Sequence, residues 1–131
     1  MNLSNWLMTA HSHIVIELMK RTKMGGIVMK TKESEKTLEA RLVREIEARG
    51  GMALKYTSQY HRGIPDRICL LPGDITVFVE LKSTGKKPTK LQEHAIKRLQ
   101  DMGYLTAVID CTEDLEHLLR FIDHASELIN G

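Results

Sequence analysis

Two acidic residues and a lysine stand at the ends of two apolar segments in the middle of the chain. Asp66 precedes the segment RICLL, while Glu80 and Lys82 close the segment ITVFVELKS. Because side chains alternate between the faces of a strand, Glu80 and Lys82 share one face. Two neighbouring carboxylates repel each other, and buried ones become protonated unless a cation lies between them. We therefore expect a hard cation such as Mg²⁺, which takes oxygen ligands, at this position.

A cation held by these acids would lower the pKa of a bound water and so generate a nucleophile. The Lys82 ammonium is placed to orient that water or to stabilise charge on a phosphorus oxygen. Acid, acid and amine together predict a metal site that attacks a phosphodiester. The alternative is that Glu80 and Lys82 are solvated charges on an exposed strand and that Pro65-Asp66 is a plain turn.

The two apolar segments are expected to form a β-hairpin. Leu71-Pro72-Gly73-Asp74 has proline and glycine where a type II turn requires them. With the turn centred on Pro72-Gly73, the numbers of paired residues sum to about 145 if the strands pair in antiparallel register. Asp66 would then face Val79 and be a neighbour of Glu80 rather than its direct partner.

The surrounding elements follow from hydrophobic periodicity and from capping residues. A helix is expected from Ser34 to Gly50, with Leu38, Leu42 and Ile46 as its apolar stripe. A short strand over residues 52–57 comes next, before the hairpin. A helix that begins after Ser83 or Thr89, a strand over residues 104–110 and a last helix from Thr112 complete the chain. The order α-β-β-β-α-β-α predicts an α/β fold, a mixed sheet flanked by helices, in which residues 75–110 form a parallel crossover.

The N-terminal segment differs from the rest. Apolar residues at helical spacing over residues 3–20 predict an amphipathic helix, and the basic, glycine-containing KRTKMGG after it resembles a linker. We therefore expect an N-terminal extension at residues 1–28 and one domain at residues 29–131.

Composition excludes several classes of protein. Hydrophobic residues make up 42% of the chain and charged residues 27%, which is typical of a globular domain. The longest apolar segment is too short and too interrupted to span a bilayer, and no signal peptide is recognised. Cys69 and Cys111 lack the spacing of a metal site, so two reduced thiols in a cytoplasmic protein are expected.

The net charge of +2 is unevenly distributed along the sequence. Residues 82–98 contain six basic residues and one acid, whereas the acids concentrate after residue 109. A basic segment directly after the acid pair would attract a polyanion, and Lys86, Lys87 and Lys90 are the expected phosphate contacts, with Arg62 before the first acid. The alternative for this segment alone is a solvated helix face.

The motif as a whole resembles that of a known nuclease family. Pro65-Asp66, followed fourteen positions after the aspartate by Glu80-Leu81-Lys82, is similar to the PD-(D/E)XK motif. The stretch from RGIPDRICLL to YLTAVID resembles the VRR-NUC (virus-type replication-repair nuclease) domain, with its Gly-x-Pro-Asp, its Glu-x-Lys and a glutamine that opens the next helix. The resemblance extends over about residues 29–110 and implies a restriction-endonuclease-like fold.

The resemblance also implies roles for individual residues. Asp66, Glu80 and the Leu81 carbonyl are implied as metal ligands, and Lys82 as the catalytic lysine. The first-helix acid falls on Glu39, with Glu35 as the competing assignment on the same helical face. Gln92 is implied as a residue that supports the metal ligands or lies near the DNA. Some relatives have an aromatic residue a few places later, where this chain has Ala95 and Ile96, so base stacking by this helix is not expected.

The resemblance completes the functional hypothesis. It implies a Mg²⁺- or Mn²⁺-dependent DNA endonuclease, similar to phage proteins that act as homodimers on branched DNA such as four-way junctions. The apolar face of residues 3–14 and the apolar stripe of the last helix are the candidate dimer surfaces. The alternatives are a non-catalytic module that binds DNA structures, or a nuclease for flaps or linear duplex.

Overall fold

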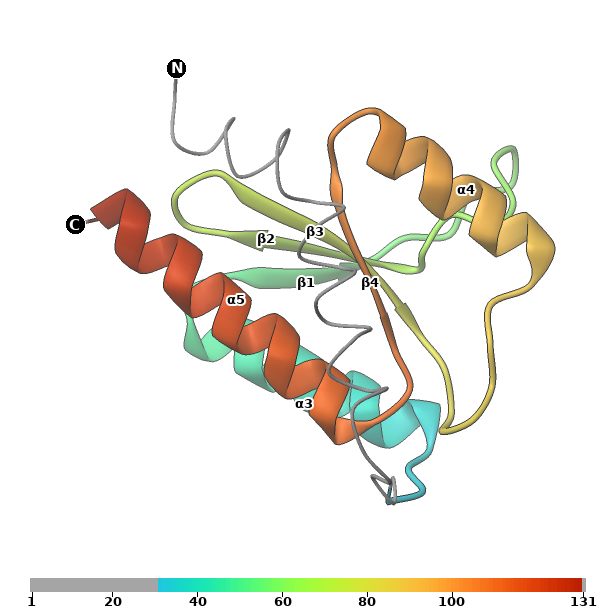
Figure 1. Ribbon diagram of the computed structural model, residues 1–131, viewed down its shortest axis with the longest axis horizontal. Helices are drawn as coiled ribbons and strands as arrows, with labels where there is room; N and C mark the ends of the chain where they lie inside the picture. Colours follow the sequence, from blue (N-terminus) through green and yellow to red (C-terminus); the bar gives the residue numbers. More distant parts are fainter. Residues whose placement is uncertain (1–30, 131) are drawn as a thin grey trace, which may run out of the picture.

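A four-stranded sheet forms the centre of the fold, which a computed structural model describes for residues 31–130 (Figure 1). The strands are β1 (Met52–Lys55), β2 (Arg67–Leu71), β3 (Ile75–Leu81) and β4 (Leu105–Ile109), in that spatial order. The first three pair antiparallel, whereas β3 and β4 run parallel. The predicted element order, hairpin and parallel crossover are confirmed, although β1 ends at Lys55 and not at residue 57. The helix expected over residues 3–20 and the segment after it lie outside the described residues.

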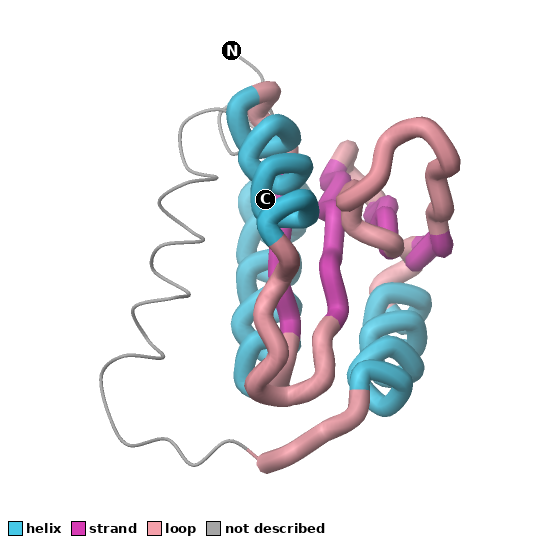
Figure 2. The backbone as a smooth tube through the Cα atoms, turned by 90° about the vertical axis from the view of Figure 1, so that its right-hand side faces the viewer, coloured by secondary structure: helices cyan, strands magenta, loops and turns pink. Residues whose placement is uncertain are grey.

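Within residues 31–130, three helices cover the two faces of this sheet. Helices α3 (Glu35–Ala48) and α5 (Thr112–Asn130) lie side by side on one face, and α4 (Lys90–Asp101) covers the other (Figure 2). Among residues 31–130, no helix is long and apolar enough to cross a membrane. The mixed sheet with helices on both faces is an α/β fold, as the sequence predicts.

The core lies between the sheet and the helix pair α3–α5. Helix α3 contributes Leu38, Leu42 and Ile46, which are fully buried because a spacing of four residues keeps them on one face. Alternate residues of β3 (Ile75, Val77, Val79 and Leu81) and the apolar stripe of α5 complete this core. The stripe of α5 is consequently used inside the domain, which removes it as a candidate dimer surface.

The hairpin turn differs from the expectation by one residue. Leu71 pairs with Ile75, so the loop contains three residues, Pro72, Gly73 and Asp74. Gly73 has the positive φ of 87° that a type II turn needs, and Asp74 is also left-handed at 63°. Paired residue numbers therefore sum to 146, as in Arg67 with Val79. The predicted sum of 145 was wrong because it did not count Asp74 as a loop residue.

Helices α3 and α5 start at one end of the sheet, and the loop that leads to α4 leaves from the same end. The parallel strands β3 and β4 end there and β2 begins there; α5 starts shortly after the end of β4, whereas α4 starts after the loop of residues 82–89 that follows β3. The residue before the α3 cap is tied to the same end, since the Glu33 N–H donates to Thr84 Oγ1 at 2.9 Å. The motif residues identified from the sequence all belong to this end.

Candidate active site

The corrected register brings the two acids of the motif into line. Arg67 is paired with Val79 at the start of β2, so the next position along the strands places Asp66 opposite Glu80. Arg67 and Val79 face the α3 helix, and by alternation Asp66 and Glu80 face α4. The backbone carbonyl of Asp66 accepts a hydrogen bond from the Tyr56 N–H at 2.8 Å, which fixes the chain just before β2.

Glu80 is a buried acid with two side-chain partners. Only 5% of the residue is exposed, yet its Oε1 atom lies 2.7 Å from Gln92 Nε2 and 3.5 Å from Lys82 Nζ. Burial raises the pKa of Glu80 above its ordinary value, and the neighbouring Asp66 charge raises it further. Lys82 and a hydrogen bond with the Asp66 backbone act in the opposite direction. The predicted shared face of Glu80 and Lys82 is confirmed.

Asp66 carries an oxygen with no hydrogen-bond partner. Asp66 Oδ1 is buried and accepts no hydrogen bond from any residue between 31 and 130. Leaving a buried polar atom without a partner costs roughly 1–3 kcal/mol. A second carboxylate that is close enough to perturb Glu80 adds repulsion to this cost. A divalent cation with oxygen ligands would relieve both, so the residues present fit Mg²⁺ or Mn²⁺.

The first turn of α4 aims Gln92 at Glu80. Thr89 caps this helix: its hydroxyl accepts from the Gln92 N–H at 3.2 Å, and its own N–H donates to Gln92 Oε1 at 2.9 Å. This reciprocal capping box occupies the amide oxygen and leaves the amide NH₂ to donate to Glu80. Of the two predicted starts for this helix, the structure uses Thr89 and not Ser83.

The first-helix acids lie on the other side of the sheet end. Glu39 Oε1 accepts from Arg67 Nη2 at 2.7 Å, and Arg67 Nη1 donates to the Ala53 carbonyl at 2.9 Å. Within the described part of the chain, no hydrogen bond or ion pair links Glu39 to Asp66 or Glu80. Glu35 is exposed in the first turn of α3. Arg67 is a residue that the sequence analysis did not single out, and its position directly after Asp66 was the available signal.

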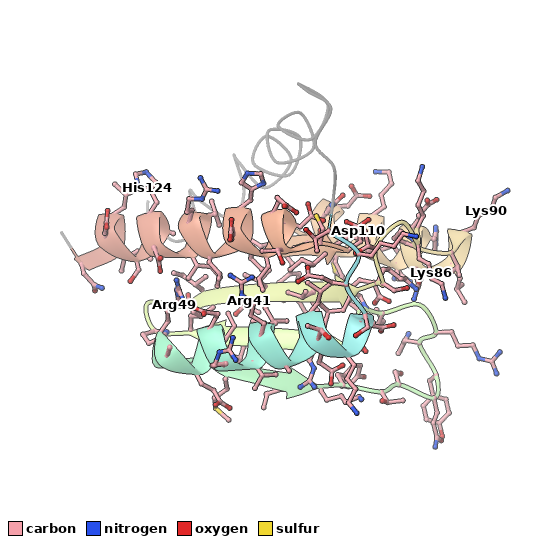
Figure 3. The ribbon with its side chains drawn as sticks, turned by 90° about the horizontal axis from the view of Figure 1, so that it is seen from below. Arg41, Arg49, Lys86, Lys90, Asp110 and His124 are labelled. Carbon is pink, nitrogen blue, oxygen red and sulfur yellow. The ribbon has the colours of Figure 1, made fainter. Side chains whose placement is uncertain are left out.

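The predicted phosphate contacts lie on the surface at the same end of the molecule. Arg62, Lys86, Lys87 and Lys90 are all exposed. Figure 3 shows Lys86 and Lys90 at one end, whereas Arg49 and His124 lie toward the other. Leu81 stands between Glu80 and Lys82, with its side chain in the core. The geometry thus gathers two acids, a lysine and an amide beside a basic surface.

Comparisons with known proteins decide the family. No profile of a known protein family matches the chain. A protein named "Putative nuclease p44", from Acyrthosiphon pisum secondary endosymbiont phage 1, is 42% identical over 87 residues, which is 65% of this chain and 90% of that protein. A solved VRR_NUC domain matches with a TM-score of 0.59 and 24% identity, over 70% of this chain and 98% of that one. The chain belongs to the VRR-NUC family. Its VRR-NUC domain has the fold that the motif implied.

A hydrogen-bonded clamp in this VRR-NUC domain holds the loop that follows Lys82. Thr84 Oγ1 donates to the Asp110 carbonyl at 2.7 Å and accepts from the Glu33 N–H, while the Thr84 N–H donates to the Glu33 carbonyl at 3.1 Å. Glu33 in turn accepts from the Thr112 hydroxyl at 2.6 Å. The clamp joins the start of α3, the end of β3 and the start of α5. It therefore fixes where β3 ends and where Lys82 lies.

A second group of acids in the VRR-NUC domain was not anticipated. Ligand atoms of Asp110, Cys111 and Asp114 lie within 4.8 Å of one another, all buried. Asp114 Oδ2 accepts from the Asp110 N–H at 3.1 Å, and Asp110 Oδ2 accepts from the Gly85 N–H at 3.2 Å. Burial raises the pKa of the Cys111 thiol to about 12. The Asp110 and Asp114 carboxylates thus link the end of β4 and the first turn of α5 to the 82–89 loop.

Proposed function

We propose that this VRR-NUC domain is a divalent-metal-dependent endonuclease that hydrolyses phosphodiester bonds in DNA. The observation that carries the proposal is the alignment of Asp66 with Glu80: a buried Asp66 oxygen has no hydrogen-bond partner among residues 31–130, and Lys82 Nζ lies 3.5 Å from Glu80. A structural ion pair explains the lysine, but it does not explain two adjacent acids at this end of the sheet. The nuclease name of the phage relative supports the same assignment.

The residues divide into metal ligands and a group that acts on the reacting atoms. Asp66, Glu80 and the Leu81 carbonyl would hold Mg²⁺ or Mn²⁺, joined by a first-helix acid, Glu39 or Glu35. A bound metal of this kind supplies a water of lowered pKa and neutralises phosphate charge. The Lys82 ammonium then orients the attacking water or donates to the phosphate oxygen on which charge develops.

The hydrogen bond from Gln92 gives Glu80 a fixed orientation. Gln92 Nε2 donates to Glu80 Oε1, and the capping box with Thr89 prevents the amide from turning its oxygen toward the acid. A carboxylate that is held in one rotamer loses little entropy when it binds a cation. Gln92 therefore acts as a positioning residue for the metal ligand.

The proposed substrate is DNA, with branched DNA such as a four-way junction as the preferred form. Phosphates would be bound, without reading of the base sequence, by the exposed cations Lys86, Lys87, Lys90 and Arg62.

A junction has two equivalent strands to cut, and one domain carries one site, so a two-fold homodimer supplies the pair of sites. Light scattering should give twice the chain mass of 14.9 kDa, and a monomer that cuts both junction strands at the same rate would contradict the dimer.

The host-cell cytoplasm is the proposed compartment, consistent with two free, buried cysteines.

The test separates a nuclease from a DNA-binding module. The purified chain is incubated with a supercoiled plasmid and with a labelled four-way junction, in Mg²⁺, Mn²⁺ or EDTA. We expect cleavage only with metal, loss of cleavage in Asp66→Asn and Glu80→Gln, and an intact gel shift in EDTA. Asp74→Asn, at the hairpin tip away from the site, is the matched control and should cut normally. A gel shift without cleavage in either metal would assign the domain to binding alone.

The same assay distinguishes the two first-helix acids. Glu39→Gln breaks the ion pair with Arg67, whereas Glu35→Gln changes an exposed position. The acid that belongs to the site is the one whose replacement raises the Mg²⁺ concentration needed for half-maximal cleavage. Arg67 provides the check on Glu39, because Arg67→Met should reproduce the effect of Glu39→Gln if the ion pair positions that acid.

A further inference from the structure

The loop between β1 and β2 exposes an aromatic side chain immediately before the acid pair. Residues 57–65 connect Lys55 and Tyr56 to Asp66, and Tyr60 near the middle of this loop is 90% exposed. A tyrosine buries a large apolar area when it is covered, so leaving it in water forgoes a substantial hydrophobic contribution. Among residues 31–130, no residue covers the ring.

Both ends of this loop are anchored. The Tyr56 N–H donates to the Asp66 carbonyl at 2.8 Å, which closes the loop at its base, and Pro65 is fully buried. Gly63, with a φ of 86°, lies so close to α4 that a Cβ atom would meet the Leu91 carbonyl oxygen at 2.6 Å. The His61 N–H donates to Ser58 Oγ at 2.9 Å. The loop is therefore a defined support for Tyr60.

Exposed basic residues occur in the same loop as Tyr60 and on the helix turn that the loop contacts. Arg62 is exposed two residues later, and Lys90 is exposed in the turn of α4 that Gly63 contacts. His61, the next residue after Tyr60, is also exposed. An exposed aromatic ring on a loop that also carries an exposed cation is a combination used to bind unpaired nucleic acid, where the ring stacks on a base and the cations contact the backbone.

We propose that Tyr60 stacks on an unpaired base that flanks the cleaved bond, so that the 57–65 loop selects DNA in which base stacking is interrupted. The inference rests on the proposed nuclease function and deepens it. Inside an intact duplex both faces of each base are covered by its neighbours, so a ring can stack only at a flap, a nick or a branch. The loop would thereby supply the preference for branched DNA that the basic surface, which contacts phosphates alone, does not supply.

Chain length limits where that base can lie. Tyr60 is six residues from Asp66, and an extended chain covers at most about 3.6 Å per residue, so the two Cα atoms are within about 22 Å. Bases along one strand of duplex DNA are about 3.4 Å apart. The stacked base should therefore lie within about six nucleotides of the cleaved phosphate, which defines the positions to label.

The experiment uses the full chain in EDTA, so that binding is measured without cleavage. A flapped duplex carries 2-aminopurine at successive unpaired positions next to the branch, and a fully paired duplex of the same sequence serves as the second substrate. Tyr60→Ala, Tyr60→Phe and the control Met102→Ala, an exposed side chain at the end of α4, are compared with the unmodified chain. Stacking of one base is worth about 1–3 kcal/mol, so Tyr60→Ala should weaken flap binding by about 5- to 150-fold.

The expected pattern has three parts. Tyr60→Ala changes duplex binding less than twofold, Tyr60→Phe and Met102→Ala bind as the unmodified chain does, and quenching of one 2-aminopurine position disappears only in Tyr60→Ala. An equal loss on flap and duplex, or no loss on either, overturns the proposal; the latter would point to a protein partner for Tyr60. If the pattern is found but Mg²⁺ supports no cleavage, the proposed function fails while the stacking contact stands.

Discussion

The buried carboxyl group of Glu80, next to Asp66, lowers the stability of the metal-free fold when it is ionised. Burial and the Asp66 charge raise the pKa of Glu80, so the folded chain holds the Glu80 proton more tightly than the unfolded chain does. The free energy of unfolding must then fall as the pH rises from the ordinary glutamate pKa of 4.5 through the raised value. At every pH above the ordinary glutamate value, the raised pKa of Glu80 therefore lowers the stability of the metal-free fold.

This sign leads to a prediction about Glu80→Gln. In EDTA at neutral pH the variant should unfold at a higher temperature than the unmodified chain. The difference should close below the ordinary glutamate pKa, where Glu80 is protonated in both the folded and unfolded states. Adding Mg²⁺ should stabilise only the unmodified chain, because a ligand of the folded state raises stability by mass action. Thermal unfolding followed by circular dichroism across this pH range checks both signs, and a less stable variant in EDTA would contradict them.

Lys82 is predicted to affect the rate of cleavage more than binding. Its ammonium lies 3.5 Å from Glu80 Oε1, and we place it on the attacking water or the phosphate oxygen. Lys82→Met should lower the single-turnover cleavage rate by about 10²-fold, as removal of one such stabilising donor does, with little change in DNA affinity. Lys97→Met, in a surface pair with Asp101, is the control lysine. A loss of affinity with an unchanged rate at saturating enzyme would make Lys82 a phosphate contact only.

At the scale of elements, the contact between the 57–65 loop and α4 joins the two halves of the site. Gly63 lies against the backbone of Leu91 and Gln92. A Cβ atom on Gly63 would be 2.6 Å from the Leu91 carbonyl oxygen and 3.1 Å from the Gln92 backbone nitrogen. The loop leads into Asp66, and Gln92 donates to Glu80. A displacement of the first turn of α4 therefore moves the amide away from the acid that it orients.

Two glycines with similar backbones test this coupling. Gly63 and Gly85 have φ values of 86° and 91°, but a Cβ at Gly85 would meet nothing within 4 Å. Each alanine variant carries the left-handed strain of roughly 1–2 kcal/mol, whereas only Gly63→Ala also displaces α4. We expect Gly63→Ala to raise the Mg²⁺ concentration needed for half-maximal stabilisation several-fold beyond Gly85→Ala. Equal metal requirements in thermal-shift titrations would show that the contact only stabilises the fold.

The whole molecule is polarised along its long axis. Lys86 and Lys90 lie at the end that carries the acid pair (Figure 3), whereas Arg49, toward the other end, is paired with Asp123 at 2.7 Å. The hydrogen bonds to Arg49 hold the pKa of Asp123 below its ordinary value, so that pair is maintained at neutral pH. Within residues 31–130, Lys86, Lys87 and Lys90 make no ion pair, so their charges are available where a polyanion would approach the site.

This polarity predicts a specific salt dependence. Replacing Lys86, Lys87 and Lys90 together with glutamine should weaken binding to all DNA alike and flatten the plot of log affinity against log salt by up to about 0.9 per lysine that contacts a phosphate. The double variant of Arg44 and Arg120 to glutamine, at exposed positions on α3 and α5, is the control and should change the slope less per charge. Filter binding over a salt series measures both slopes. Equal changes in slope per charge in the two variants would show that the three lysines are solvated surface residues and not phosphate contacts.

Much of the architecture was determined by the sequence itself. The stripe of Leu38, Leu42 and Ile46 and the capping residues Ser34 and Thr89 specify helices through contacts within one or two turns. The turn residues Pro72 and Gly73 specify the hairpin, and the crossover between β3 and β4 requires a parallel pair. These features are local, so periodicity and turn chemistry predict them without knowledge of the packing.

Only the tertiary structure decided how the site is assembled. The left-handed Asp74 shifts the hairpin register by one residue, and this shift places Asp66 opposite Glu80. The contacts of Gln92 with Glu80 and of Arg67 with Glu39 depend on how α4 and α3 pack on opposite faces of the sheet. Residues 12 and 28 positions apart meet through this packing, and no local pattern in the chain encodes the distance between such side chains. The sequence therefore specifies which groups are present at the sheet end, and the packing of the helices specifies which of them touch.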